Sequence, residues 1–244
     1  MKLDVCFSPV LYPFYAEKNQ IVIIVDIFRA TTSICTAFRN GAKAVITVAS
    51  VEEAVLFKEK GFPVAAERNV KKCEFADFGN SPFDFTPEKV IGKEIVFTTT
   101  NGTKAVEMAL DADEILIGAF SNISVMADYC SSKNKNVLIL CSGWNNRFCI
   151  EDTLFAGALT EKLIQTGNFR GKSDSTVTAM DLWKIAKTDI KAYICKTEHY
   201  DRLKMNGLEN SVEYCFSENT APVLPTYNKS GKMLVVTVAT ALVH

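Results

Sequence analysis

Histidine is scarce in this chain of 244 residues, which contains only His199 and the C-terminal His244. No CxxC pair accompanies them, although the sequence has eight cysteines. A structural zinc site usually combines four closely spaced cysteine and histidine ligands, so the sequence argues against such a site. The cysteines at positions 6, 35 and 141 lie in or beside apolar runs, as small core residues do.

An excess of basic charge is also missing, because 27 Lys and Arg residues are balanced by 28 Asp and Glu residues. Nucleic acids and anionic membrane surfaces usually require a basic stripe, so we expect neither as a partner. No apolar run approaches the roughly 18 residues of a membrane-spanning helix, and the first residues lack the apolar core of a signal peptide. The sequence therefore predicts a soluble cytoplasmic protein with reduced cysteines.

Two glycine-rich nucleotide-binding motifs are absent too. No GxGxxG follows the first apolar runs, which weighs against a dinucleotide site. The GxxxxGK[ST] spacing of a Walker A loop does not occur either. Any phosphate-binding site in this protein must therefore be built from other residues.

Short apolar runs alternate with helical patterns in the first part of the chain. Fully apolar strands separated by helices are typical of a parallel sheet that is covered on both faces. The sequence therefore predicts an α/β protein with three α/β/α layers and a mostly parallel sheet. The expected strands are 3–6, 21–26, 44–48, 63–66, 95–98, 115–118 and 137–141, and the expected helices are 31–40, 51–60, 103–110 and 121–132.

Helical patterns dominate the second part of the chain. They cover residues 151–166, 176–187, 189–195, 198–205 and 208–216. Two late apolar segments, 221–227 and 233–241, are candidates for strands that return to the sheet. We expect residues 1–170 to form an α/β core that carries most of the site. Residues 171–244 then form a helix-rich part with C-terminal strands, either in the same domain or in a second one.

The turn after the second expected strand carries unusual chemistry. Asp26 ends this strand, and Arg29 and Thr31 open the helix that follows. A carboxylate is a hard oxygen ligand for Mg²⁺, and a guanidinium can bind phosphate with two parallel hydrogen bonds. The start of the helix adds unpaired N–H groups. Taken alone, the turn is equally well interpreted as a capped helix with a local Asp–Arg pair.

Four further turns carry similar groups. Each of them alone is explained by an ion pair, a capped turn or acidic residues in a first helical turn. The carboxyl ends of parallel strands meet at one edge of a sheet, so we expect the five turns to form one site for a metal and a phosphate. The residues of the four turns are Glu67 and Arg68; Asn80 and Ser81; Thr99, Asn101, Gly102 and Thr103; and Ser142, Gly143, Glu151 and Asp152.

Four segments combine into a specific pattern: VDIFRATTSICTAFRNGA, FGNSP, TTTNGT and CSG followed by EDTLFAGAL. In this order and at this spacing, they resemble the 2-phosphosulfolactate phosphatase (ComB) family. The resemblance covers most of the chain and is strongest over residues 20–160. It implies a Mg²⁺-dependent enzyme that hydrolyses 2-phosphosulfolactate to 3-sulfolactate and phosphate, a step associated with coenzyme M synthesis. Where the family usually has GERGG, this chain reads AERNV, which keeps Glu67 and Arg68 but loses the glycines.

The resemblance and the strand-end residues together define the expected site. The expected catalytic residues are Asp26, Arg29, Glu67 and Glu151. The expected Mg²⁺ ligands are Asp26, Glu67, Glu151 and Asp152. The expected substrate-binding residues are Thr31, Arg68, Asn80, Ser81, Thr99, Asn101, Gly102, Thr103, Ser142 and Gly143. We expect Arg29 and the loop 99–103 to hold the phosphoryl oxygens, and Arg68 to meet the carboxylate or sulfonate of the substrate.

Other mechanisms and functions remain open at this point. A covalent aspartyl-phosphate mechanism requires a DxD motif. This motif is missing, because Asp26 is followed by Ile27 and Phe28 and no second aspartate stands at position 28. A cysteine-type phosphatase is an alternative, since Cys141 and Arg147 match the spacing C-x5-R. A non-catalytic anion-binding module on the same fold is a second alternative. A homodimer is the expected assembly of a compact α/β enzyme.

Overall fold

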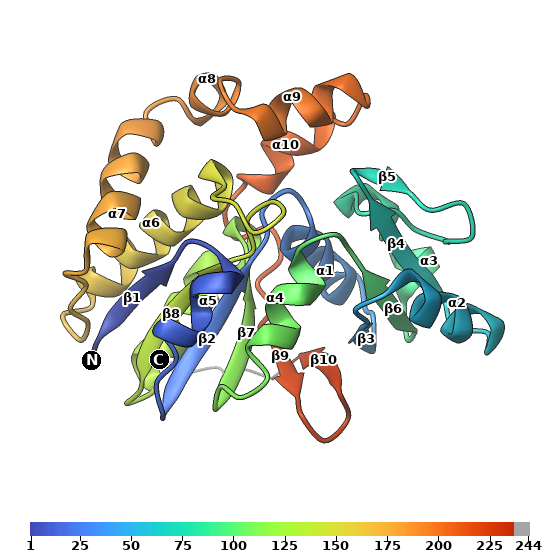
Figure 1. Ribbon diagram of the computed structural model, residues 1–244, viewed down its shortest axis with the longest axis horizontal. Coiled ribbons are helices and arrows are strands. Elements are labelled where there is room, and N and C mark those ends of the chain that lie inside the picture. The colour runs from blue at the N-terminus through green and yellow to red at the C-terminus, as the bar shows by residue number, and fades with distance from the viewer. Residues whose placement is uncertain (237–244) are drawn as a thin grey trace.

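Strands and helices alternate along the chain, as predicted. The computed structural model describes residues 1–236 (Figure 1). All seven strands expected before residue 150 are present, with ends shifted by two residues at most. The strands are β1 (Leu3–Cys6), β2 (Gln20–Val25), β3 (Ala44–Thr47), β4 (Val64–Arg68), β5 (Lys71–Lys72), β6 (Glu94–Thr98), β7 (Glu114–Gly118), β8 (Asn136–Cys141), β9 (Pro225–Asn228) and β10 (Met233–Val236).

The helices also follow the predicted pattern. Three short elements were not expected: the 3₁₀ helices η1 (Pro9–Phe14) and η2 (Pro82–Asp84), and α3 (Pro87–Val90), which all begin at a proline. The other helices are α1 (Ala30–Arg39), α2 (Val51–Glu59), α4 (Gly102–Met108), η3 (Phe120–Asn122), α5 (Ile123–Ser132), α6 (Ile150–Gln165), α7 (Asp174–Ala186), α8 (Ile190–Ile194), α9 (Glu198–Met205) and α10 (Asn210–Cys215). Within residues 1–236, no helix has both the length and the apolar character needed to cross a membrane.

The described strands form one sheet in the order β1-β8-β2-β7-β9-β10-β3-β6-β4-β5. Parallel pairing joins β1, β8, β2 and β7 in one group, and β3, β6 and β4 in another. The antiparallel hairpin β9–β10 lies between the groups and pairs with β7 at Leu116 and with β3 at Val45. The two late apolar segments therefore return to the sheet as predicted, although residues 237–241 of the second lie outside the described residues.

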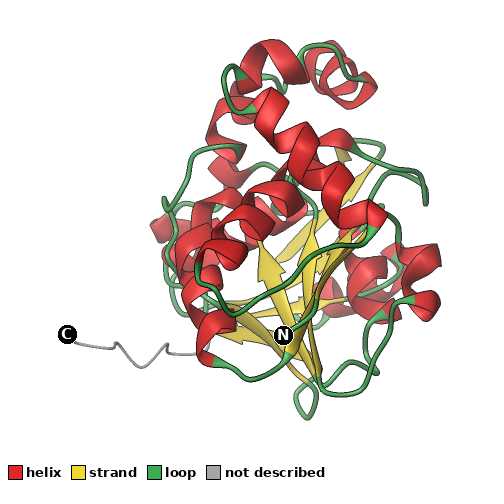
Figure 2. Cartoon of the chain, turned by 90° about the vertical axis from the view of Figure 1, so that its left-hand side faces the viewer, coloured by secondary structure: helices red, strands yellow, loops and turns green. Residues whose placement is uncertain are grey.

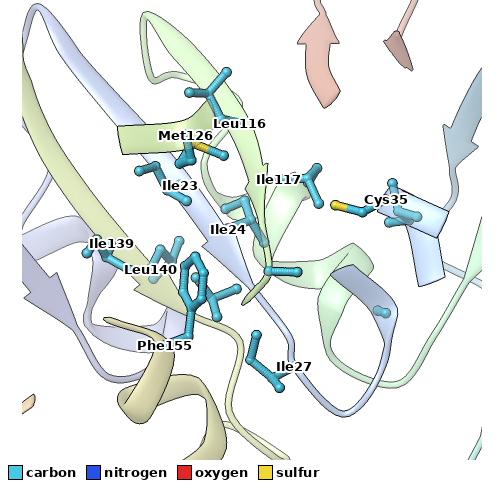
Figure 3. Close-up of a cluster of buried hydrophobic side chains, with 14 of the residues drawn as sticks. Ile23, Ile24, Ile27, Cys35, Leu116, Ile117, Met126, Ile139, Leu140 and Phe155 are labelled. Carbon is cyan, nitrogen blue, oxygen red and sulfur yellow. The ribbon is translucent and has the colours of Figure 1, made fainter. Parts of the chain in front are cut away.

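Helices cover both sides of the sheet, as Figure 2 shows, and the core lies between these layers. The apolar residues of β2 are completely buried, as expected for a central parallel strand. Figure 3 shows Ile23 and Ile24 of β2 near Ile117 of β7 and Phe155 of α6. A side chain at Gly118 would lie 2.6 Å from Ile23 and 3.0 Å from Phe155, so the glycine allows α6 to pack closely on the sheet.

The C-terminal helices share this core. Leu203 of α9, and Val212 and Cys215 of α10, are buried in the same apolar cluster as the central strands. In Figure 1, α8, α9 and α10 lie together at the top of the molecule, above α1 and beyond the upper end of α6. The expected division near residue 170 stays a prediction, but the helices after it pack on the α/β core.

Phe155 offers a test of this packing. It is fully buried and contacts Phe120 edge to face at 5.4 Å between ring centroids. Phe155→Ala leaves a cavity under α6, and we expect it to lower the free energy of unfolding by about 3–5 kcal/mol in urea denaturation. Phe14→Ala is the matched control, because Phe14 is 85% exposed and its loss should cost less than about 0.5 kcal/mol. Equal effects of the two substitutions would contradict the described core.

Candidate functional site

The turn between β2 and α1 is held by its own hydrogen bonds. The Ala30 N–H donates to Asp26 Oδ1 at 3.3 Å, and the Thr31 N–H and hydroxyl donate to the Asp26 carbonyl at 3.0 and 2.9 Å. Asp26 is buried directly after β2. Thr31 thus shapes the turn that presents Asp26, and its expected part in substrate binding stays a prediction.

Arg29 is buried and has no direct ion-pair partner in the described part of the chain. It is the residue before α1 and only 3% exposed. Burial lowers the pKa of its guanidinium, although the charges of Glu67, Asp84 and Asp26 act against that shift. Its Nη1 donates to Ser211 Oγ on α10 at 3.4 Å, and among residues 1–236 no carboxylate oxygen lies within 4.0 Å of it. Because its N–H groups meet no carboxylate directly, this guanidinium has donors to offer to an anion.

The turn after β4 keeps its shape without the family's glycines. Asn69 and Val70 have φ values of 51° and 63°, in the left-handed region where a two-residue hairpin turn usually has glycine. Glu67 is buried, and its Oε1 accepts from the Val70 N–H at 2.5 Å and from Thr100 Oγ1 at 3.4 Å. Burial raises the pKa of Glu67, while the Val70 N–H and Arg29 act against that shift. The half-buried Arg68 donates to Thr98 Oγ1 at 2.9 Å.

The start of α4 approaches the Asp26 turn closely. A Cβ at Gly102 would lie 2.9 Å from Asp26 Oδ2 and 2.9 Å from the Ala30 side chain, so only glycine fits here without movement. Thr103 Oγ1 donates to the Thr99 carbonyl at 3.2 Å and holds the loop after β6. The structure therefore brings the expected turns after β2 and β6 into contact.

Asp152 ties a third turn to the same place. Its Oδ1 accepts from the Ile27 N–H at 2.9 Å, and its Oδ2 accepts from the Gly143 N–H at 3.0 Å. Burial raises the pKa of Asp152 well above its usual value, and the charges of Glu151 and Asp26 add to this effect. Asp152 thus joins the turns after β2 and β8, and its expected part in metal binding stays a prediction.

Three other expected residues, Asn80, Ser81 and Asn101, lie at the edges of this region. The Asn80 carbonyl accepts from Ser33 Oγ of α1 at 3.0 Å, which holds the loop before η2 against α1. Ser81 is half-buried before η2 and makes no capping hydrogen bond. The half-buried Asn101 side chain accepts from the Asn145 N–H at 3.0 Å and links the loops after β6 and β8.

His199 completes the site and was not expected from the sequence. Its Nδ1 lies 2.5 Å from Glu151 Oε1, and both side chains are buried. Burial opposes the ionisation of Glu151, but the contact with His199 outweighs it and lowers the pKa of Glu151 overall. Phe28 and Trp144 pack against the imidazole. The signal in the sequence was its rarity, since His199 is the one histidine before the C-terminal residue.

Four buried polar atoms in these elements have no hydrogen-bond partner within the described part of the chain. They come from four different segments, and each would cost about 1–3 kcal/mol if left unpaired in the working protein. The four atoms are Asn80 Oδ1, Thr99 Oγ1, Ser142 Oγ and His199 Nε2. Three of these residues were expected to bind substrate, so their free donors and acceptors support a polar ligand here.

The carboxylates of the site fit a hard cation. Burial raises the pKa of Asp26 to about 7, although His199 and the Ala30 N–H lower it, and the charges of Glu67 and Glu151 raise it further. Buried carboxylates that repel one another are stabilised by a divalent cation. Mg²⁺ usually needs only one or two carboxylates and keeps several waters. In the described chain, the most compact potential ligand group is Cys149, Glu151 and His199, which contains one expected Mg²⁺ ligand.

The structure contradicts the cysteine-type alternative. Cys141 is completely buried at the end of β8, and burial raises the pKa of its thiol well above the usual value. Arg147 is exposed, beyond a turn in which the backbones of Trp144 and Arg147 pair. A nucleophilic thiolate needs a lowered pKa and an accessible sulfur, and Cys141 has neither. The match to C-x5-R therefore does not identify a catalytic cysteine.

Comparisons with known proteins show to which family the chain belongs. The model of the 2-phosphosulpholactate phosphatase family matches residues 6–230. A probable 2-phosphosulfolactate phosphatase of Caldanaerobacter subterraneus is 38% identical over 213 residues, which are 86% of this chain and 87% of that protein. Proteins with the same description from Clostridium novyi and Thermotoga maritima are 35% and 34% identical, over 93% and 88% of this chain and 97% and 92% of their own lengths.

The fold and the matches together define a phosphatase of the α/β class, with its polar centre at the carboxyl ends of parallel strands. The chain belongs to the 2-phosphosulpholactate phosphatase family. The resemblance seen in the four sequence segments is thereby confirmed.

Asp26→Asn tests the electrostatics of the centre. The pKa of Asp26 is raised on folding, so its burial lowers stability as the pH rises from about 4 towards 7, by roughly 4 kcal/mol at most. We expect the asparagine variant to be more stable than the unsubstituted protein at pH 8 without metal, and the difference to shrink at pH 5. Urea denaturation at both pH values measures this.

Asp128→Asn is the control for this substitution, because Asp128 is exposed on α5. It should leave stability within about 0.5 kcal/mol at both pH values. If the stability of Asp26→Asn and of the unsubstituted protein changed with pH in the same way, the pKa of Asp26 would not be raised by burial.

Proposed function

We propose that this protein hydrolyses 2-phosphosulfolactate to 3-sulfolactate and phosphate with the help of Mg²⁺. The observation that carries the proposal is the buried, unpaired guanidinium of Arg29 beside buried carboxylates. A phosphate monoester supplies the anion that Arg29 lacks, and a divalent cation compensates the carboxylates. The family to which the chain belongs takes its description from the same substrate.

The phosphoryl group would be held from two turns. Arg29 offers its free guanidinium N–H groups. The loop 99–103 offers the unpaired Thr99 hydroxyl, and it reaches the Asp26 turn at Gly102. Preorganised donors of this kind stabilise the charge that develops on phosphoryl oxygens in the transition state.

The carboxylates would hold the cation. Asp26 and Glu151 are the ligand candidates with most support, because both are buried and interact electrostatically with each other. Glu67 is a further ligand or a base that orients the attacking water. When bound, Mg²⁺ supplies charge neutralisation at the phosphoryl oxygens and a water of lowered pKa.

The other anionic groups of the substrate need their own donors. Arg68 lies beside Glu67 at the edge of the centre and is half-buried. The side-chain NH₂ group of Asn80 and the Ser81 hydroxyl are further donors, on the loop that packs on α1. We assign the carboxylate and sulfonate of the substrate to this side, because a phosphate site alone does not distinguish phospho-acids.

A non-catalytic anion-binding module is less well supported. A receptor for anions alone gains nothing from buried Asp26, Glu67 and Glu151, since carboxylates repel an anion unless a cation lies between them.

We further propose that the enzyme works in the cytoplasm and that its product enters coenzyme M synthesis. The free cysteines fit a reducing compartment. We also propose that the enzyme is a homodimer.

A phosphate-release assay tests the proposal. The substrates are 2-phosphosulfolactate and phospholactate, which lacks the sulfonate, each with Mg²⁺ and with EDTA. We expect turnover of 2-phosphosulfolactate to fall at least about a hundredfold in EDTA and to return with Mg²⁺. Phospholactate should be the poorer substrate, because the donors around Arg68 then lack an anion.

Cys141→Ser is the control in this assay and should retain activity within about twofold, since the thiol is buried and neutral. Turnover that persists in EDTA but disappears in Cys141→Ser would overturn the metal route. Absence of turnover with every phospho-acid would favour the anion-binding module.

A further inference from the structure

Cys149, Glu151 and His199 form a compact buried group that the proposed reaction uses only in part. The cysteine Sγ, a carboxylate oxygen and a ring nitrogen all lie within 4.8 Å of one another. Cys149 directly precedes α6, Glu151 lies in its first turn, and His199 comes from α9. No other group of this kind occurs in residues 1–236.

The orientation of His199 fits a ligand role at this group. Its Nδ1 faces Glu151 Oε1 at 2.5 Å, so Nδ1 is the nitrogen that would bind a metal held between the two side chains. Nε2 points away from Glu151, is buried and has no hydrogen-bond partner within residues 1–236. The rings of Phe28 and Trp144 pack against the imidazole and fix its orientation.

The three donors are not those that Mg²⁺ prefers. Mg²⁺ takes hard oxygen ligands, whereas a thiolate, an imidazole and a carboxylate together are typical of Zn²⁺. Ligand atoms around one Zn²⁺ lie roughly 3.3–3.6 Å apart, given its usual bond lengths. The Glu151–His199 contact of 2.5 Å would therefore open by about 1 Å, and Cys149 Sγ, which lies within 4.8 Å of both partners, would move to the bound spacing.

We infer that Cys149, Glu151 and His199 bind Zn²⁺ or a similar borderline divalent cation. Binding forms Zn–S, Zn–O and Zn–N bonds to Cys149, Glu151 and Nδ1 of His199, and leaves the fourth position to water or another ligand. The thiol proton of Cys149 and the proton shared by Glu151 and Nδ1 are released to solvent, and the imidazole keeps its proton on Nε2. Burial raises the pKa of the Cys149 thiol, so the metal displaces a bound proton rather than meeting a ready thiolate.

Zn²⁺ at this group would inhibit the phosphatase. Glu151 cannot serve the Zn²⁺ and the proposed Mg²⁺ site with the same orientation, because Zn²⁺ draws it towards Cys149 and His199. This consequence rests on the proposed function, whereas Zn²⁺ binding itself rests on the three donors alone.

Co²⁺ is the spectroscopic probe for binding, because cobalt bound to a thiolate gives a sulfur-to-metal charge-transfer band. The full-length protein should bind one Co²⁺, display this band, and lose it on addition of Zn²⁺. Cys149→Ser should lose the band and weaken Zn²⁺ binding at least about tenfold in calorimetry. Cys130→Ser is the matched control, since Cys130 is also a buried cysteine but lies on α5, and this variant should keep both properties.

The assay of phosphate release gives an independent readout. Zn²⁺ should inhibit the unsubstituted protein and Cys130→Ser, while Cys149→Ser should need at least about tenfold more Zn²⁺ for the same inhibition. Without Zn²⁺, Cys149→Ser should keep its Mg²⁺-dependent activity. Circular dichroism checks the fold, and Cys149→Ala replaces Cys149→Ser if the serine variant does not fold.

The outcomes separate the two proposals. Absence of a charge-transfer band in the unsubstituted protein, or equal Zn²⁺ affinity in the Cys149 variant, overturns the zinc site. If neither Cys149 variant folds, His199→Gln decides, and unchanged Zn²⁺ affinity in that variant overturns the site. A zinc site in a protein that hydrolyses no phospho-acid would support this inference and contradict the proposed function.

Discussion

Charge is buried at the carboxyl end of β2, and the neighbouring turns and helices are arranged around it. Asp26 is buried in the same turn that places the guanidinium of Arg29 in the interior. Neither group has an ion-pair partner within 4.0 Å among residues 1–236. The raised pKa of Asp26 reflects the free-energy cost of burying its ionised carboxylate. The apolar core beneath β2 stabilises the fold enough to tolerate that cost, and a bound cation and anion would remove it.

Distant segments of the chain meet at this point because of the sheet order. The hairpin β9–β10 joins the two parallel groups of strands, so the turns after β2 and β6 touch at Gly102 although they belong to different groups. The helices after residue 170 then add Ser211 to Arg29 and His199 to Glu151. The helix-rich part is therefore a component of the site, not only a cover for the core.

Local patterns in the sequence predicted the strands and the Asp26 turn, because a central apolar strand and the turn after it depend on adjacent residues. His199 could not be predicted in this way, since its contact with Glu151 spans 48 positions of the chain and depends on how α9 packs. The roles of Thr31 and Asp152 were also out of reach. From the sequence alone, a hydroxyl or carboxylate beside a turn is equally well interpreted as a partner of backbone groups or as a ligand contact. Only the three-dimensional geometry shows which backbone groups the side chain meets. The role of Cys141 was ambiguous for the same reason, because the C-x5-R spacing does not show whether the cysteine is buried.

Anomalous diffraction from crystals grown with Mn²⁺ and inorganic phosphate would locate the cation and the anion together, since Mn²⁺ is a hard oxygen-binding ion that replaces Mg²⁺ and is recognised by its scattering. We expect an anomalous peak beside the carboxylates of Asp26 and Glu151, with the phosphate on the guanidinium of Arg29. A phosphate bound instead in the open groove between Lys58 and Lys93, with no metal at Asp26, would contradict this expectation.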